Sequence, residues 1–405
     1  MGALNSGDTA WLLVSTALVF FMMPGLALFY GGLVGGKNVV ATMVQSFVAI
    51  GILSLVWVVI GYSLVFGPDH WGLIGGLNLA MLHGVGEAPS SWAPTIPALA
   101  YMAFQMKFAV ITPALIAGAV AERMRFAGYL VFITLWSLLI YCPLAHWVWG
   151  GGFLGAGWLH AIDFAGGSVV HASAGAAALA AAIYVGRRRG PVPAPHNIPL
   201  VLLGAGILWF GWFGFNAGSA LSAGGVGALA LVNTQLGAVT AMLAWMAVEW
   251  RHRRPSGVGL ASGAVAGLAA ITPAAGYVQP WAALLIGLAA GLVCYYACHL
   301  KIRFKYDDSL DVVGVHMVGG VIGILLTGVF ATLVVNASGA AGGLTQLGRQ
   351  ALLDVVALGF PFVGTLLLLM LTDRLVGVRV SAEDEIAGLD LSQHGEVAYP
   401  STVEG

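Results

Sequence analysis

Two stretches of the chain, DFAGGSVVHASAG (Asp163–Gly175) and DVVGVHMVGG (Asp311–Gly320), each place a histidine inside a long apolar run. A titratable imidazole is costly in sequence that faces hydrocarbon, so it usually faces a protein interior or a pore and marks a transport path. His171 and His316 could instead be two unrelated structural histidines, each satisfied by a neighbouring helix. The transport interpretation makes these two residues the first candidates for a functional site.

The composition indicates an integral membrane protein. Of the 405 residues, 59% are hydrophobic and only 8% are charged, and the mean hydropathy is +0.92. Charged residues make up about a quarter of an ordinary soluble protein, so this chain is expected to cross the cell membrane many times. A net charge of −1 and the lack of a basic domain give no indication of a nucleic-acid partner.

The sequence does not favour metal binding or catalysis. Cys142, Cys294 and Cys298 lie in apolar stretches and are interpreted as small core residues. An enzyme in which the two histidines hold a metal is the weakest hypothesis, because no third ligand or HExxH spacing lies near either one. We therefore expect no enzyme activity, no metal and no cofactor.

Eleven apolar stretches are long enough to cross about 30 Å of hydrocarbon. They fall at about 10–34, 44–66, 97–119, 125–144, 163–186, 197–217, 226–250, 257–274, 279–300, 312–335 and 350–376. The segment 149–162 could be a loop, a half-helix or the entry to the fifth stretch. We expect an all-α membrane protein with eleven transmembrane helices, the first of which is retained and is not a signal peptide.

The basic residues predict the orientation. Of the 16 lysines and arginines, 14 follow odd-numbered stretches, and the exceptions are Lys107 and Arg349. Because basic loops stay in the cytoplasm, the N-terminus is expected outside and the C-terminus inside.

The placement of the histidines suggests an inverted repeat. His171 lies eight residues after Asp163, and His316 lies five residues after Asp311. Five stretches separate the two, so their helices run in opposite directions, as in transporters whose site lies near the midplane. We expect residues 1–377 to form one membrane domain, with stretches 1–5 and 6–10 as the repeats and the eleventh at the periphery.

The polar segment 378–405 is too short to fold alone. It is either a disordered solubilising end or a regulatory tail that docks on the cytoplasmic ends of the helices, near the basic loops at Arg187–Arg189 and Arg251–Arg254. Ordering so polar a segment costs about 1–2 kcal/mol per residue, so order in this segment would indicate docking.

Aromatic residues cluster in LALFYGG, MAFQMKFA and WFGFNAGSA. Phe104 and Phe108 are four residues apart and share a helix face. A stripe at this spacing is more often core than site, but aromatic faces also bind small cations well. Trp149 could belong simply to an interfacial aromatic belt.

With these segments in view, the chain resembles the Amt/Rh ammonium transporter family over essentially its whole length, and looks like the bacterial or archaeal Amt branch. The resemblance rests on PGLALFYGG, KNVV, AHWVWGGG, DFAGGSVVHASAG, WFGFNAGSA, ITPAAGYV, DDSLDVVGVH and GLDLSQHGE, which occur in the family's order. It implies a homotrimer with one central pore per subunit and a PII signalling protein as a partner at the cytoplasmic face.

The resemblance also implies roles for individual residues. These are an external ammonium recruitment site (Phe104, Trp149 and Ser219), a gate beneath it (Phe108 and Phe215), the pore lining (His171, His316, Trp212 and Phe29) and an acidic support for the recruitment region (Asp163).

Physical reasoning agrees with these implied roles. Ammonium has the size and charge of potassium, so charge alone cannot separate the two ions. Moving the whole ion into an apolar pore is costly, whereas ammonium can shed a proton and cross as NH3. We therefore expect recruitment of NH4+, deprotonation, and conduction of NH3 past the histidines, with or without a separate proton path. The alternative is an ammonium sensor that signals through its tail and a PII-type partner.

Two residues have open interpretations. Asp163 could be a helix N-cap that satisfies backbone N–H groups, in which case it supports the site without touching substrate. Lys107 stands between the two phenylalanines of the third stretch but about 100° around the helix from Phe108. It could approach an interface or, if it faced the entrance, repel ammonium.

Overall fold

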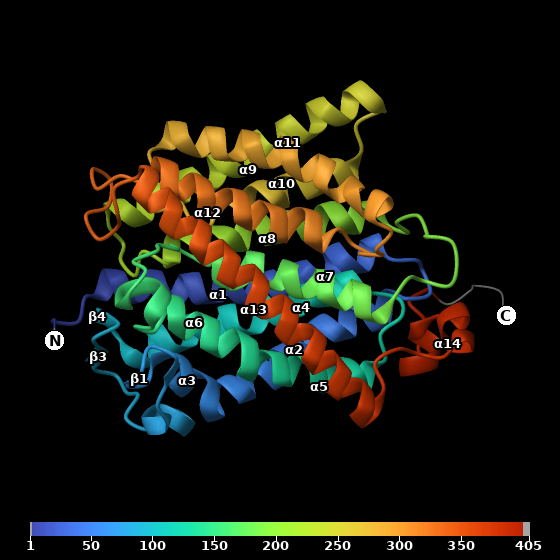
Figure 1. The fold of residues 1–405 in the computed structure, drawn as a ribbon, viewed down its shortest axis with the longest axis horizontal. Coiled ribbons are helices and arrows are strands. Elements are labelled where there is room, and N and C mark those ends of the chain that lie inside the picture. The colour runs from blue at the N-terminus through green and yellow to red at the C-terminus, as the bar shows by residue number, and fades with distance from the viewer. Residues whose placement is uncertain (1, 400–405) are drawn as a thin grey trace.

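The structure is a computed structural model that describes residues 2–399, and most of its helices run roughly along one axis (Figure 1). The N-terminal residues lie at one end of the bundle, called here the N-side, and α14 lies at the other, the C-side. The α-helices are α1 (Ser6–Leu33), α2 (Val39–Val56), α3 (Tyr62–Phe66), α4 (Ala98–Val120), α5 (Phe126–Trp136), α6 (Cys142–Trp149), α7 (Ser173–Val185), α8 (Ile198–Gly218), α9 (Gly225–His252), α10 (Gly257–Ile271), α11 (Pro280–Phe304), α12 (Val318–Phe330), α13 (Leu344–Val376) and α14 (Ala382–Ala387).

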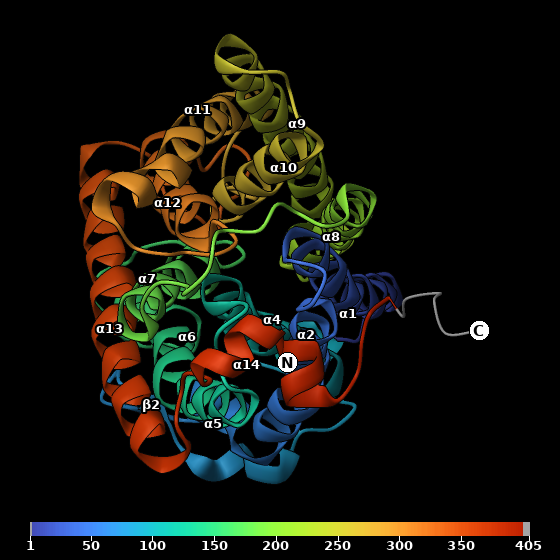
Figure 2. The same cartoon turned by 90° about the vertical axis from the view of Figure 1, so that its right-hand side faces the viewer.

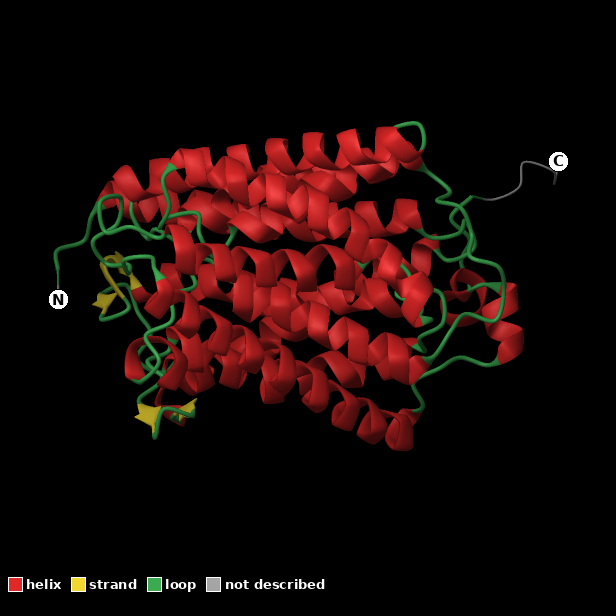
Figure 3. Ribbon diagram, turned by 45° about the horizontal axis from the view of Figure 1, so that its top comes forward, coloured by secondary structure: helices red, strands yellow, loops and turns green. Residues whose placement is uncertain are grey.

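Short irregular helical segments and two hairpins complete the fold. The π-helical segments are η1 (Trp57–Gly61), η3 (Ser137–Tyr141), η4 (Phe153–Gly157), η5 (Gly167–Ala172), η6 (Val313–Met317) and η7 (Asp390–His394), and η2 (Leu77–Leu82) is a 3₁₀ segment. Strands β1 (Asp69–His70) and β2 (Ile74–Gly75) pair antiparallel, as do β3 (Pro89–Ser90) and β4 (Ala93–Pro97). Figure 3 shows these strands gathered at the N-side, a small exception to the expected all-α class.

All eleven predicted stretches contain an apolar helix, but one is short. In the described residues, ten helical segments are long and apolar enough to cross a membrane, and the eighth stretch holds only α10, with 15 residues. At 1.5 Å per residue α10 extends about 22 Å. It ends at Ile271, immediately before Thr272 and Pro273, where proline disfavours continued helix.

The fourth and fifth stretches differ from their expected limits. Helix α6 ends at Trp149, and the segment after it is a glycine turn, the short segment η4 and a loop. The fifth helical segment starts at Gly167 and not at 163, because the preceding residues cap it. The segment 149–162 is therefore one helical turn followed by a loop.

Seen end-on, α8–α12 gather in one part of the bundle and α1–α7 in the other (Figure 2). Helix α13 runs along one edge and packs against α5, α7 and α12.

The two groups approach each other most closely between α1 and α8. A Cβ atom added at Gly204 of α8 would lie 2.3 Å from the backbone nitrogen of Phe29, and one at Gly211 would lie 2.2 Å from Met22 Cγ. Small residues allow this approach, which provides the packing that stabilises helices in lipid. The contact also sets the pore-facing side chains of α1 against those of α8.

We expect Gly204→Ala to destabilise the protein by about 2–3 kcal/mol, because the new methyl group must displace α1 backbone. The matched control is Gly206→Ala on the same helix, where an added Cβ meets nothing within 4 Å. Thermal unfolding in detergent should show a lower midpoint for the first variant only. Equal midpoints would contradict the tight packing of α1 on α8.

The tail is ordered as far as the structure describes it, up to residue 399, while residues 400–405 of the predicted tail lie outside the described residues. Backbone hydrogen bonds join Arg125 N to Val378 O and Val380 N to Arg123 O. Beyond them, Asp390 accepts a hydrogen bond from Ala41 N at the start of α2.

Docking occurs at one of the two predicted basic loops. Arg379 donates to Arg187 O, and its ion pair with Glu385 lies beside Arg189, whose backbone N–H also donates to Glu385. Among the described residues, no hydrogen bond or ion pair joins the tail to the second predicted loop, Arg251–Arg254. The expectation of docking at that loop is therefore not met within one chain.

Candidate functional site

The two histidines meet inside the bundle. Their Nδ1 atoms are 3.3 Å apart, and the rings are nearly parallel with centroids 5.3 Å apart. Both side chains are buried. They share a narrow cavity with mainly apolar side chains, which are Met22, Leu26, Phe29, Ile111, Leu115, Val170, Leu208, Trp212, Phe215 and Val265.

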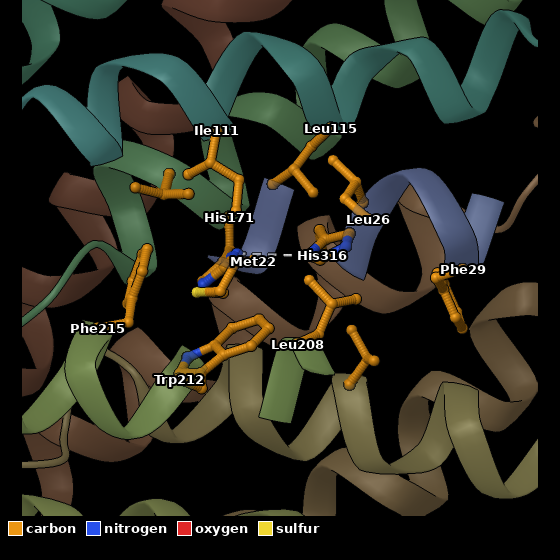
Figure 4. A pocket seen from close by; sticks show the side chains of 12 residues that line it. Met22, Leu26, Phe29, Ile111, Leu115, His171, Leu208, Trp212, Phe215 and His316 are labelled. Carbon is orange, nitrogen blue, oxygen red and sulfur yellow. Dashed lines mark hydrogen bonds between the residues drawn. The ribbon is translucent and has the colours of Figure 1, made fainter. Parts of the chain in front are cut away.

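Figure 4 shows the order of the side chains in this cavity. Phe215 lies at one end and Phe29 at the other, with the hydrogen-bonded imidazoles of His171 and His316 between them. Trp212 stacks on His171, with ring centroids 5.2 Å apart, and donates its indole N–H to the Thr272 hydroxyl at 2.9 Å. The predicted pore residues therefore converge on one cavity.

Each histidine lies in a π-helical segment, His171 in η5 and His316 in η6. Such segments are often found at functional sites because they redirect one side chain from a regular helix. Asp163 stabilises the start of η5: its carboxylate accepts from the backbone N–H groups of Gly166, Gly167 and Ser168 at 2.7–2.8 Å. This is the capping geometry considered for Asp163 from the sequence.

The counterpart of Asp163 in the second half is Asp308, not Asp311. Asp308 accepts from Val313 N, five residues on, just as Asp163 accepts from Ser168 N, five residues on. It also precedes its histidine by eight residues, the spacing found in the first half. From the sequence, Asp311 was matched to Asp163 because it precedes His316. In the structure, Asp311 forms an ion pair with Lys301 at 2.6 Å.

The rings of Phe108 and Phe215 separate the histidine cavity from a pocket on its N-side. Their centroids are 4.2 Å apart, and both side chains are fully buried. Phe215 lines the histidine cavity and Phe108 lines the N-side pocket. The pair therefore occupies the position predicted for a gate.

The N-side pocket is lined mainly by aromatic and polar side chains, with two aliphatic ones, and its lining residues are Trp92, Tyr101, Gln105, Phe108, Val148, Trp149, Phe164, Ser219 and Leu221. Trp149 donates its indole N–H to Asp163 O at 2.9 Å. The Ser219 hydroxyl donates to Phe215 O at 2.8 Å, so its oxygen remains available as an acceptor. Aromatic faces and a hydroxyl oxygen together suit a small cation with N–H donors.

The structure brings Trp149 and Ser219 together but leaves Phe104 out of the pocket. Phe104 is fully buried behind Phe108, with ring centroids 5.1 Å apart, and Phe108 supplies the aromatic wall. The i,i+4 spacing of these two residues could not show which ring faces the pocket, since the rotation of α4 depends on its neighbours.

Sequence reasoning missed Tyr101 and Gln105, which line the pocket and hydrogen-bond to each other at 3.3 Å. Tyr101, Gln105 and Phe108 stand at i, i+4 and i+7, the spacing of one helix face. That periodicity was a usable signal for these two residues. Trp92 and Phe164 reach the pocket from loops, and no periodicity marks them.

Lys107 does not line the N-side pocket. Its ammonium group lies over the Phe20 ring, 5.3 Å from the centroid, in a separate small cavity between α1, α2 and α4. The repulsion of ammonium considered from the sequence therefore has no geometric basis at the pocket. The three cysteines are buried and free, as expected, and residues 2–399 contain no group of three or more metal-ligating side chains.

Comparisons with known proteins match the chain over nearly its whole length. The sequence model of the Ammonium Transporter Family matches residues 10–399. The chain is 46% identical to the ammonium transporter of Bacillus subtilis (strain 168) over 407 residues, which are 99% of this chain and 100% of that protein. It resembles the crystal structure of Saccharomyces cerevisiae Mep2 with a TM-score of 0.91 and 36% identity, covering 99% of this chain and 93% of the other. A structure named Sensor Amt Protein gives a TM-score of 0.89 at 32% identity, covering 96% of this chain and 98% of the other.

Proposed function

The chain belongs to the ammonium transporter family, and from this premise we propose a route by which it moves its substrate. NH4+ enters the N-side pocket, releases a proton at the Phe108–Phe215 pair, and crosses as NH3 past His171 and His316. The released proton crosses separately along the two imidazoles, which can accept and donate protons, and rejoins NH3 on the C-side. One positive charge therefore crosses with each NH3. The observation that carries the proposal is the order of the parts: a polar aromatic pocket, two closed rings, and a mainly apolar cavity holding paired imidazoles.

Recruitment rests on Phe108, Trp149 and Ser219. The two aromatic faces attract a cation by about 0.5–2 kcal/mol each. The Ser219 oxygen accepts an N–H of the ion, because the hydroxyl proton is directed to Phe215 O. These contacts replace part of the water shell before the ion reaches the rings.

Deprotonation is expected because an ion would be costly in the histidine cavity beyond the two rings. Beyond the rings the cavity is lined mainly by apolar side chains, so an unpaired ion there is strongly disfavoured. Neutral NH3 avoids this cost, and potassium has no equivalent step.

The histidine pair supplies the polar contacts that NH3 needs inside the cavity. A hydrogen bond between two Nδ1 atoms requires one ring to donate and the other to accept, so neutral rings adopt opposite tautomers. The two Nε2 atoms then offer one donor and one acceptor along the path. His171 Nε2 has no hydrogen-bond partner among the described residues, so it is available to bind NH3.

The broader arrangement belongs to the same proposal. The N-side faces the exterior and the C-side the cytoplasm of a cell-membrane protein, with one pore in each subunit of a homotrimer. The matched roles of Asp163 and Asp308 in the two halves support an inverted repeat. A PII-type protein would meet the C-side, where the tail is docked. The similarity to Sensor Amt Protein favours one alternative, an ammonium sensor that reports through this tail.

An ammonium pulse on a solid-supported membrane should produce a current in the wild-type protein, and the current should persist in a large excess of potassium. Potassium alone should give none, because selection depends on a removable proton. A comparable potassium current would exclude deprotonation as the selective step. Absence of any ammonium current, with ammonium binding retained, would favour the sensor.

A further inference from the structure

His146 lies at the N-side end of α6 between two oxygen acceptors. Its Nδ1 is 2.7 Å from Val65 O, and its Nε2 is 2.8 Å from Asp69 Oδ1. The side chain is fully buried, and no step of the proposed transport route uses it. A backbone carbonyl only accepts hydrogen bonds, so Nδ1 must carry a proton.

Asp69 has the features of an ionised carboxylate. Its side chain is 42% exposed, and both oxygens accept from Gly72 N, at 2.9 and 3.0 Å. The hydrogen bond from His146 lowers the pKa of Asp69 below its usual range. Because Asp69 then only accepts, Nε2 of His146 must also carry a proton, and the ring is an imidazolium.

On one side, the hydrogen bond from His146 Nδ1 to Val65 O lies against the segment that carries Trp149. The backbone N–H groups of Gly150 and Gly152 both donate to His146 O, at 2.9 and 3.0 Å. A Cβ atom at Gly150 would lie 2.0 Å from Val65 O and 2.6 Å from His146 Nδ1, so the chain passes directly against this hydrogen bond. Trp149, next in sequence to Gly150, lines the N-side pocket.

On the other side, the same end of α3 holds a second wall of the pocket. Phe66 O, one residue after Val65, accepts the indole N–H of Trp92 at 3.1 Å, and Trp92 also lines the pocket. Two consecutive carbonyls of α3 therefore fix Trp92 directly and the Trp149 end of α6 through His146.

We infer that His146, paired with Asp69, is a positioning residue for the recruitment pocket. It holds the Trp149 end of α6 against α3 and β1, and the affinity for NH4+ depends on this pair. This inference rests on the proposed function where it is tested by ammonium current. The pairing of His146 with Asp69 rests on geometry alone.

The test compares three forms of the full-length protein by ammonium-pulse current at one pH. In Asp69→Asn, His146 can donate to Val65 O and accept from the new amide, so the half-saturating NH4+ concentration should stay close to that of the wild type. In Asp69→Ala, His146 loses its partner, and the half-saturating concentration should be about three- to tenfold higher, as expected for the loss of one hydrogen bond. Maximal current should change little in any form.

Glu87→Gln is the matched control, because it removes one negative charge from the same surface pocket as Asp69 without touching His146. It should keep the half-saturating concentration of the wild type. An Asp69→Ala variant with the wild-type half-saturation and the wild-type maximal current would overturn the inference. So would an Asp69→Ala variant that loses maximal current with unchanged half-saturation, since that result indicates a merely structural role.

A second measurement does not depend on transport. Hydrogen exchange of the segment 147–157 should be slow in the wild type and in Asp69→Asn, and faster in Asp69→Ala. If the protein carries no ammonium current but shows this exchange pattern, the proposed function fails and the positioning role of the pair stands. An exchange pattern identical in all three forms would exclude the positioning role.

Discussion

Replacing His171 by leucine is expected to lower the ammonium current about 100-fold, which corresponds to about 2.7 kcal/mol in the transport barrier. The substitution removes both ring nitrogens from a cavity that is otherwise mainly apolar and leaves His316 without its partner at 3.3 Å. NH3 crossing the cavity then loses hydrogen bonds that cost about 1–3 kcal/mol each when left unmade. The measurement is the peak current after an ammonium pulse at equal protein density.

The control for His171→Leu is Leu208→Met, a replacement of similar volume in the same cavity, which should keep most of the current. Thermal unfolding should be similar in both variants, so that loss of current is not loss of fold. A normal current in His171→Leu would remove the histidine pair from the transport path.

Deleting residues 380–405 is expected to leave a folded membrane domain with at least about fivefold lower ammonium current, the size of a coupling free energy near 1 kcal/mol. The deletion removes the hydrogen bond of Asp390 to Ala41 N at the start of α2, that of Leu389 N to Asn38 Oδ1, and the Arg379 partner Glu385. The C-side end of α2 and the loop after α7 then lose their contacts with the tail. Current and thermal stability should be measured on the same preparation.

Two point substitutions separate docking from the mere presence of the tail. Asp390 is 1% exposed and accepts from α2, so Asp390→Ala should reproduce part of the loss. Glu396 is exposed, so Glu396→Ala should not. Equal current, and equal inhibition by a PII protein, before and after deletion would show the tail to be only a solubilising end.

Several features of this protein can be predicted from the sequence because the membrane constrains the backbone of each segment separately. In hydrocarbon each segment must satisfy its own backbone hydrogen bonds, so a long apolar stretch is a helix whatever its neighbours are. The apolar stretches, the two buried histidines and the capping interpretation of Asp163 are all of this kind. The differences from the predicted limits also have local causes. Helix α10 is short because Thr272 and Pro273 end it. Segment η5 begins at Gly167 because Asp163, its capping residue, precedes it.

The arrangement of side chains within the site depended on contacts between distant segments. Phe104 and Phe108 are equivalent in the sequence, and only the rotation of α4 within the bundle turns Phe108 to the pocket and Lys107 away from it. The sequence pointed to Asp311 as the acidic residue that precedes His316, whereas the structure shows that Asp308 caps η6 and that Asp311 pairs with Lys301.

The pairing of His146 gave no signal in the sequence, because its partner Asp69 is 77 residues away. The sequence therefore determined which segments enter the membrane and which residues could titrate there, since burial in lipid is imposed on each helix separately. Tertiary structure alone decided which faces meet and which charges pair, because those depend on the close approach of helices at small residues such as Gly204.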